Sequence, residues 1–255
     1  NALAAAAEIE RLLGELPGPA VGPAPRRAPV SVPAEPVQVH APVLQARGLV
    51  LRPLGAGHDV LQGLGFQLEP NQRLAVVGPS GSGKSTLLEA LAGWLPPREG
   101  SIIVRPGLEV GYAGQRPYLF HGSIADNLRL ADPTASLATL RQAAGAAQVL
   151  AFADRLPDGL DTVIGERGFG LSGGEARRIG LARLLLRNPG IMLLDEPTAF
   201  LDPRTEAALL QALAIHARGR SVIIATHSPA AIAWADSTLR LPDGLLHHDP
   251  RQVRA

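Results

Sequence analysis

The stretch Gly78–Thr86, with the sequence GPSGSGKST, decides the fold that we expect for this chain. It matches the pattern G-x-x-x-x-G-K-[ST], whose backbone N–H groups cradle phosphates and whose hydroxyl binds magnesium. The apolar run at residues 73–78 predicts a buried strand before it, and leucines at 87, 88, 91 and 95 predict a helix over residues 86–95. Because strand, loop and helix are the context that the pattern requires, we expect these residues to bind nucleotide phosphates: Gly78, Pro79, Ser80, Gly81, Ser82, Gly83, Lys84, Ser85 and Thr86.

Two further apolar runs lead to polar residues that belong near this loop. Residues 191–194 and 221–226 are short and continuously apolar, which is typical of central parallel strands. Asp195 and Glu196 follow the first run, and His227 follows the second. Since ligands of open α/β sheets bind at the carboxyl ends of the strands, we expect the chemistry of the protein at this edge.

The residue types at this edge suit phosphoryl transfer. Lys84 would neutralise the β- and γ-phosphates, while Ser85 and, through water, Asp195 would hold Mg²⁺, a hard cation that prefers oxygen ligands. Glu196 adjoins the metal-binding aspartate and is therefore well placed to polarise the attacking water. The sequence thus predicts hydrolysis of a nucleoside triphosphate.

A second glycine-rich motif, LSGGE at residues 171–175, precedes the strand that ends at Asp195. A glycine pair that opens a helix presents backbone N–H groups to an anion. The two motifs in this order resemble the nucleotide-binding domains of ATP-binding cassette (ABC) proteins. The resemblance implies an ATPase that uses ATP and Mg²⁺.

The resemblance also implies roles for residues whose spacing alone says little. His227 would contact the γ-phosphate and orient the water. Gln115, in YAGQRPYLF, resembles the glutamine of the Q-loop, which approaches Mg²⁺ while its flanking segment touches a membrane domain. The expected catalytic residues are then Glu196, His227, Lys84 and Gln115, and the expected metal ligands are Ser85, Gln115 and Asp195.

By the same resemblance, two such domains meet head to tail, and each signature motif closes over the ATP of the other domain. The partner would be a second ABC ATPase domain, identical or homologous. Asp202, in AFLD, matches the D-loop that runs along this interface. The residues expected to complete the partner's site are Ser172, Gly173, Gly174 and Glu175.

We expect an α/β fold with a RecA-like parallel sheet core, a small antiparallel β subdomain, and a helical signature subdomain over about residues 126–170. VLQARGLVL and GLGFQL predict short strands of the antiparallel part. Residues 1–16 show helical spacing, and residues 17–42 are dense in proline, which predicts a linker or a disordered tail before an ATPase domain at 43–255. In exporters that carry both domains on one chain, such a helix continues from the transmembrane domain, which this chain lacks.

Composition narrows the class of protein further. The 255 residues are 46% hydrophobic, enough for a sizeable core, and the net charge of +1 gives no electrostatic footprint for nucleic acid. Without cysteine, neither a disulfide nor a thiolate metal site is possible. Lacking an apolar run of about 18 residues, the fragment is expected to be soluble and to act at the cytoplasmic face of the cell membrane.

Several segments resemble ABC exporters in particular. TVIGERG at residues 162–168 matches a segment in which Glu166 and Arg167 would face intracellular helices of the partner's membrane domain. LFHGSIADNLRL at residues 119–130 also matches exporter patterns. Within exporters, residues 156–202 resemble the D subunit of the heterodimeric thiol exporters needed for cytochrome bd assembly, which implies cysteine or glutathione as cargo.

One departure from the exporter pattern concerns the adenine site. Pro53 stands where exporters usually carry an aromatic residue that stacks on adenine, and His58 is a candidate replacement. Three alternatives stay open beside the exporter: an importer ATPase, a soluble ABC protein of translation or DNA repair, and a cassette that binds ATP with little hydrolysis. The segment before residue 43 disfavours the importer ATPase. The lack of a second cassette or a long coiled coil disfavours the soluble ABC protein, and intact Glu196 and His227 disfavour the cassette with little hydrolysis.

Overall fold

The computed structural model describes residues 41–53, 55–165, 168 and 170–248. The helix expected at residues 1–16 and nearly all of the linker expected at 17–42 lie outside the described residues. The exporter-type residues Glu166 and Arg167 also lie outside them.

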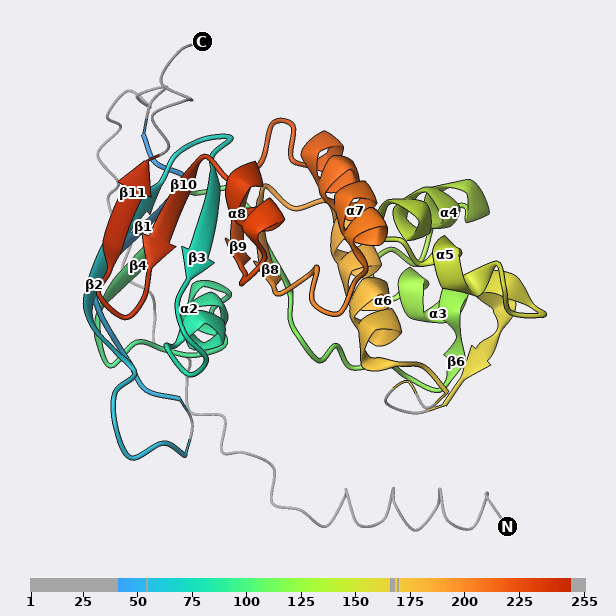
Figure 1. Cartoon of the computed structure of the whole chain (residues 1–255), viewed down its shortest axis with the longest axis horizontal. Helices are drawn as coiled ribbons and strands as arrows, with labels where there is room; N and C mark the ends of the chain where they lie inside the picture. The colour runs from blue at the N-terminus through green and yellow to red at the C-terminus, as the bar shows by residue number, and fades with distance from the viewer. Residues whose placement is uncertain (1–40, 54, 166–167, 169, 249–255) are drawn as a thin grey trace, which may run out of the picture. The chain divides into compact units, whose positions relative to one another are not determined.

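A six-stranded sheet forms the centre of the described chain (Figure 1). Its strand order is β11-β10-β3-β9-β8-β5, and all neighbours pair in parallel except β10 and β11. Every residue of the two interior strands β8 and β9 is buried, as expected for strands covered on both faces. The strands are β3 (Arg73–Val77), β5 (Val110–Ala113), β8 (Ile191–Asp195), β9 (Ser221–Ala225), β10 (Ser237–Arg240) and β11 (Leu245–His248).

An antiparallel sheet of three strands, in the order β2-β1-β4, packs on one side of this centre. The strands are β1 (Leu44–Leu51), β2 (Leu61–Leu68) and β4 (Glu99–Val104). Helix α2 (Lys84–Leu91) lies between the two sheets, and its Leu87 and Leu88 are fully buried in the same hydrophobic cluster as Leu193 of β8. The helix ends earlier than the leucine spacing predicts, because Gly93 takes a left-handed backbone conformation at φ 79°.

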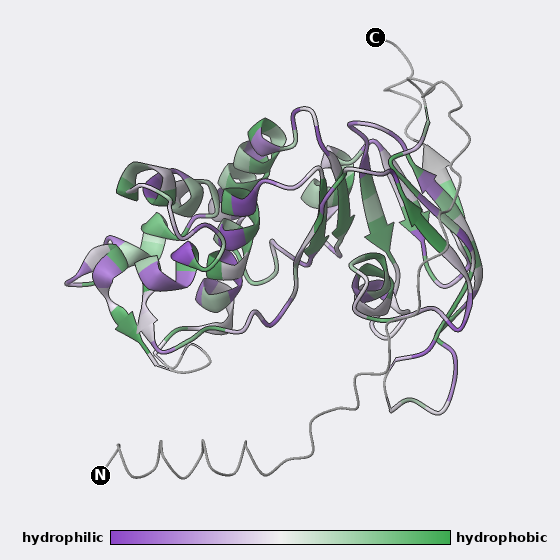
Figure 2. Ribbon diagram, turned by 180° about the vertical axis from the view of Figure 1, so that it is seen from behind, coloured by the Kyte–Doolittle hydropathy of each residue, from purple (hydrophilic) through white to green (hydrophobic). Residues whose placement is uncertain are grey.

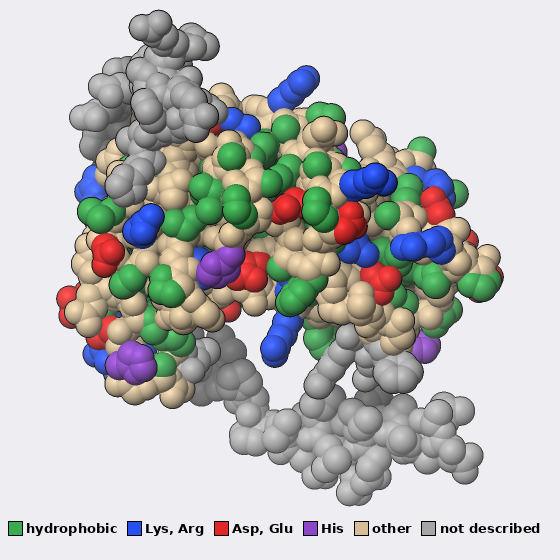
Figure 3. Space-filling model, viewed as in Figure 1, with side chains coloured by type: hydrophobic (Ala, Val, Ile, Leu, Met, Phe, Trp, Pro, Cys, Tyr) green, Lys and Arg blue, Asp and Glu red, His purple; other side chains and the backbone are tan. Residues whose placement is uncertain are grey.

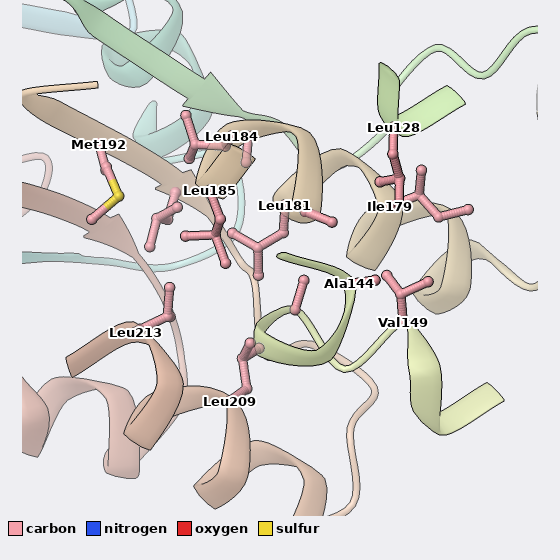
Figure 4. Packing of buried hydrophobic residues seen from close by; sticks show 14 of the residues in the cluster. Leu128, Ala144, Val149, Ile179, Leu181, Leu184, Leu185, Met192, Leu209 and Leu213 are labelled. Atoms are coloured by element: carbon pink, nitrogen blue, oxygen red, sulfur yellow. The ribbon is translucent and has the colours of Figure 1, made fainter. Parts of the chain in front are cut away.

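A second hydrophobic cluster joins the other face of the central sheet to the helices (Figure 4). In it, Met192 of β8 packs with Leu184 and Leu185 of α6 and with Leu209 and Leu213 of α7. The helices are α3 (Ile124–Arg129), α4 (Leu137–Ala146), α5 (Leu150–Ala153), α6 (Gly173–Arg187), α7 (Pro203–His216) and α8 (Pro229–Trp234). A 3₁₀ turn, η1 (Gly159–Asp161), and a short ladder of β6 (Gly122–Ser123) and β7 (Val163–Ile164) complete the helical part.

The hydropathy of the elements agrees with this layering. Figure 2 shows the central strands as mostly hydrophobic, whereas the helices mix hydrophobic and hydrophilic residues. On the face drawn in Figure 3, acidic and basic side chains are interspersed among hydrophobic ones. The α/β class, the parallel core and the antiparallel β part predicted from the sequence are confirmed.

The central sheet should dominate the stability of the domain. We expect Leu193→Ala, in the middle of β8, to lower the free energy of unfolding by about 2–5 kcal/mol, because the fully buried side chain leaves a cavity between the sheet and α2. Urea unfolding followed by circular dichroism measures the loss. As the control, Ile215→Ala removes an exposed side chain from α7 and should change the free energy of unfolding by less than about 0.5 kcal/mol. Equal losses in both variants would contradict this assignment of the core.

Candidate active site

The carboxyl ends of four parallel strands meet at one edge of the central sheet. The register pairs Val76 of β3 with Ala225 of β9, and Ala225 with Asp195 of β8. On the other side of β8, Leu194 pairs with Ala113 of β5. Backbone pairing therefore places the loops that follow β3, β5, β8 and β9 side by side.

The loop after β3 has the steric form that the glycines of the motif predict. A Cβ atom at Gly78 would lie 2.6 Å from the carbonyl oxygen of Leu241 and 2.6 Å from Ser82 Oγ. Gly83 has φ 92°, and a Cβ atom there would lie 3.0 Å from Leu61 Cγ. Neither position accepts a side chain, so the backbone turns tightly into α2 at Lys84.

Lys84 is the buried cation of this loop. Its side chain folds back, and Nζ donates hydrogen bonds to the carbonyl oxygens of Gly78, at 2.9 Å, and Pro79, at 3.0 Å. Burial lowers the pKa of Lys84, while the charges of Glu196 and Asp195 act in the opposite direction. The ammonium group thus lies within the loop and within the electrostatic influence of both acidic residues.

The three side chains predicted to hold Mg²⁺ come together in the structure. Gln115 Nε2 donates to Asp195 Oδ1 at 3.1 Å and to Ser85 Oγ at 3.3 Å. Asp195 is almost fully buried, at 1% exposure. A hydroxyl, a carboxylate and an amide are the oxygen donors that a hard cation selects, so this set fits Mg²⁺. The described residues contain no group of three or more His, Cys, Asp or Glu side chains that could hold a metal.

Glu196 and His227 face each other at the ends of β8 and β9. Their Oε1 and Nε2 atoms are 3.6 Å apart, and the histidine is the more exposed of the two side chains. The backbone of Glu196 is left-handed, with φ 49°, although its side chain is bulky. Such a conformation is uncommon outside glycine and persists where the surroundings impose it, often at functional sites.

Arg177 of α6 is a site residue that sequence reasoning missed. Its Nε donates to the carbonyl oxygen of Gln115 and its Nη1 to that of Glu196, both at 3.3 Å. The guanidinium carbon also lies 5.7 Å from the centre of the exposed Phe200 ring. One arginine therefore connects the helix of the signature motif to the loops after β5 and β8. The bonded residues are 62 and 19 positions away in sequence, so spacing alone carried no signal for these contacts.

The signature residues form the start of α6. Ser172 is the N-cap, its Oγ accepts from the backbone N–H of Glu175, and the Glu175 carboxylate accepts in return from the backbone N–H of Ser172. Asp202 caps α7 in a similar way and accepts hydrogen bonds from Thr205 and Arg204, which lower its pKa. Within the described part of the chain, no hydrogen bond joins residues 172–175 or Asp202 to the loop at 78–86.

The region of Pro53 is organised by charged residues. Asp59 accepts from Arg52 Nε at 2.9 Å and from Arg98 Nη1 at 3.0 Å, and these hydrogen bonds lower its pKa. His58, the candidate for stacking on adenine, is exposed. The side chains closest to a Cβ atom placed at Gly83, the residue before Lys84, are those of Leu61 and Val60.

A groove of about 910 Å³ lies beside the three side chains predicted to hold Mg²⁺. It is lined by α2, β5, the segment after Gln115, and α6, and Ser85, Gln115 and Asp195 contribute to its wall. Burial first, and then the charge of Asp195, raise the pKa values of Glu89 and Tyr112 in this wall. Large apolar side chains stand exposed in the groove, namely Trp94, Tyr118, Phe120 and Leu130.

Comparison with known proteins identifies this arrangement. The model of the family described as "ABC transporter" matches residues 61–199, which include the phosphate loop, the signature motif and both acidic residues after β8. The chain belongs to the ABC transporter family. A second model, for an AAA domain, matches residues 167–233.

Two curated relatives of this ABC domain have names that state opposite directions of transport. The mycobactin import ATP-binding/permease protein IrtB of Mycobacterium tuberculosis is 42% identical over 207 residues, which are 76% of this chain and 36% of that protein. The ATM1-type heavy metal exporter of Novosphingobium aromaticivorans is 38% identical over 200 residues, or 74% of this chain and 33% of that protein. The chain therefore spans about a third of the length of these relatives.

A solved structure of a bacterial Atm1-family ABC exporter with ATP bound has the same fold. The two chains superimpose with a TM-score of 0.74 at 33% identity, covering 99% of this chain and 45% of the other. In the described ranges, no helix of our ABC domain is both long and apolar enough to cross a bilayer. The chain is an ABC-type ATP-binding and ATP-hydrolysing domain with exporter relatives.

Loss of the Arg177 contacts should slow hydrolysis more than it weakens nucleotide binding. We expect Arg177→Ala to lower kcat about tenfold, because two charge-assisted hydrogen bonds to the loops of Gln115 and Glu196 are lost while the phosphate loop is untouched. Steady-state ATPase assays and ATP titration separate the two effects. Arg187→Ala, at the exposed end of the same helix, is the control and should keep the normal kcat. A normal kcat for Arg177→Ala would contradict a positioning role.

Proposed function

We propose that this chain is the ATP-hydrolysing domain of an ABC exporter, with Glu196 as the residue that activates water. The observation that carries the proposal is the meeting of Lys84, Gln115, Asp195, Glu196 and His227 at one edge of the sheet. Each supplies a function that phosphoryl transfer needs: a cation, an amide near the metal, a metal-binding carboxylate, a base, and a side chain that orients the water and the γ-phosphate.

The chemistry follows from the positions of these groups. Lys84 would exchange its bonds to the carbonyl oxygens of Gly78 and Pro79 for bonds to phosphate oxygens. The Glu196 carboxylate would accept a proton of the attacking water, and His227, 3.6 Å away, would orient that water and the γ-phosphate. Mg²⁺, when bound through Ser85, Asp195 and Gln115, supplies charge neutralisation at the phosphates.

The site is proposed to be completed by a second ABC domain, identical or homologous. Ser172 and Gly173 at the start of α6 are exposed, and the helix has its positive dipole end there. Gly174 and Glu175 belong to the same turn, and Asp202 is the N-cap of α7. A head-to-tail dimer would place this turn over the ATP of the partner, so ATP becomes part of the contact.

The groove beside Gln115 is the proposed contact with a transmembrane domain. Its exposed Trp94, Tyr118 and Phe120 form an apolar surface of the kind that marks protein interfaces. Gln115 is part of the groove wall and bonds to Ser85 and Asp195. Binding of a partner in the groove would therefore act directly on the proposed metal ligands. The ATPase domain, proposed at residues 43–255, would then lie on the cytoplasmic side of the membrane, tethered by residues 1–42.

Export is the proposed direction of transport. It is supported by the heavy metal exporter of Novosphingobium aromaticivorans and by the Atm1-family structure. The name of IrtB pairs import with an ATP-binding/permease chain, so a chain that joins the two domains does not by itself indicate export. Thiol export for cytochrome bd assembly stays a hypothesis that rests on the resemblance of residues 156–202. The names of the relatives given above do not refer to thiols.

Substitution of the base should separate binding from turnover. We expect Glu196→Gln to reduce the ATPase rate by roughly a hundredfold or more while ATP still binds, since the amide cannot accept the proton of water. Lys84→Ala should instead weaken ATP binding itself, because the buried cation is lost. Rates from phosphate release and affinities from ATP titration give the comparison. Full activity in Glu196→Gln would remove the proposed base.

The dimer can be tested on the Glu196→Gln protein, which should trap ATP between two domains. With Mg-ATP we expect a solution mass twice the 26.6 kDa of one chain, and without nucleotide the mass of one chain. Light scattering after size exclusion measures both. Adding Ser172→Arg to this variant should prevent the dimer while ATP still binds. A monomer with ATP bound in the single variant would indicate that the partner must be a homologous domain rather than a second copy.

A further inference from the structure

Both carboxylate oxygens of Asp195 are held by hydrogen bonds, and only one of them comes from a residue that the family resemblance assigns. Oδ1 accepts from Gln115 Nε2 at 3.1 Å, whereas Oδ2 accepts from the phenol hydroxyl of Tyr112 at 3.3 Å. Tyr112 lies on β5, next to the strand that carries Asp195, and its backbone partner is Leu193. The pairing of the edge strand β5 with β8 thus sets the position of the hydroxyl along the strands relative to the carboxylate.

The chain leaves space for the phenol ring in this position. A Cβ atom at Gly114 would lie 3.0 Å from the Tyr112 oxygen and 3.0 Å from Cε1. A larger residue at 114 would therefore have to push the ring away from Asp195. The ring is held on another side by Trp94, whose ring centre is 4.9 Å away at an interplanar angle of 87°. Edge-to-face packing of this kind favours one ring orientation.

Trp94 connects this pair to the surface. Its side chain is 68% exposed, and it lines the same groove as Tyr112 and Asp195. A series of contacts therefore joins the exposed surface of the groove to the Asp195 carboxylate: Trp94 packs on Tyr112, and Tyr112 bonds to Asp195. This path does not include Gln115.

We propose that Tyr112 is a positioning residue that orients the Asp195 carboxylate for Mg²⁺, and that Trp94 connects its position to the groove. The inference rests on the proposed function, because it takes Asp195 as a metal-binding residue. The hydroxyl holds Oδ2, while Oδ1 is bonded to the Gln115 amide that also contacts Ser85. Groups that fix a metal-binding carboxylate in this way raise the affinity for the metal. The groove then has two contacts with the metal ligands, one through Gln115 and one through Trp94 and Tyr112.

Metal affinity tests the role of the hydroxyl apart from activity. Mn²⁺ serves as the probe, and electron paramagnetic resonance measures its binding to the full chain in the presence of a non-hydrolysable ATP analogue. We expect Tyr112→Phe, which removes only the hydroxyl, to weaken Mn²⁺ binding roughly tenfold. The affinity for the analogue in EDTA should stay normal, because in the described structure the Tyr112 hydroxyl bonds to Asp195 and makes no hydrogen bond to the phosphate loop.

The chain offers a matched control, because its second tyrosine, Tyr118, lines the same groove without bonding to Asp195. Tyr118→Phe should leave Mn²⁺ affinity unchanged. Asp195→Asn tests the metal site itself and should bind Mn²⁺ much more weakly. If Asp195→Asn loses the metal while Tyr112→Phe binds it normally, the positioning role is wrong and the proposed metal site stands. If Asp195→Asn binds Mn²⁺ normally, the metal site and this inference both fail.

Trp94 supplies a spectroscopic test of the connection to the groove. The chain has two tryptophans, so Trp234→Phe leaves Trp94 as the single tryptophan, whose emission is separated from that of tyrosine by excitation at long wavelength. We expect Mg²⁺ to change the Trp94 emission of the analogue-bound protein, and Tyr112→Phe in this background to remove most of that change. The same change with and without the hydroxyl, at saturating Mg²⁺, would show that Trp94 does not respond through Tyr112 and would overturn this part of the proposal.

Discussion

The parallel pairing of β3, β9, β8 and β5 is the constraint on which the rest of the structure depends. Backbone hydrogen bonds align Val76 with Ala225, Ala225 with Asp195, and Ala113 with Leu194. A shift by one residue in any of these pairs would exchange the side chains that face the two buried clusters, so the packing of both clusters holds the register. The loops that carry the site therefore meet at one edge because the strands beneath them have no other favourable arrangement.

Two kinds of contact then bring charged groups to this edge. Within the loop after β3, glycines allow the backbone to surround the Lys84 ammonium group, which is buried and hydrogen-bonded to carbonyl oxygens. Across elements, Arg177 joins the helix of the signature motif to the loops of Gln115 and Glu196. The same helix packs against α3, α4 and β5. Under the proposed function, Arg177 would therefore carry a displacement of the helical part to the loops of Gln115 and Glu196.

The groove lined by Trp94, Tyr112 and Gln115 also adjoins the site. Its aromatic side chains are exposed although they adjoin a nearly fully buried aspartate. Exposure of such area costs free energy in water, which is consistent with a surface that a partner covers. Tyr112 and Gln115 bond to different oxygens of Asp195, so any occupant of the groove would lie within one or two side chains of the proposed metal ligands.

The sequence alone determined the α/β class, the central strands, the phosphate loop and the membership in the ABC family, because each depends on local patterns: an apolar run, a glycine at a tight turn, a motif of fixed spacing. It also named the residues that the structure brings together around Asp195 and at the Glu196–His227 pair. Only the tertiary structure decided the roles of Arg177, Tyr112 and Trp94, since their partners are distant in sequence or are reached by the direction of a side chain across two strands. Backbone pattern predicts which strand a residue occupies, but packing decides which atoms that residue touches.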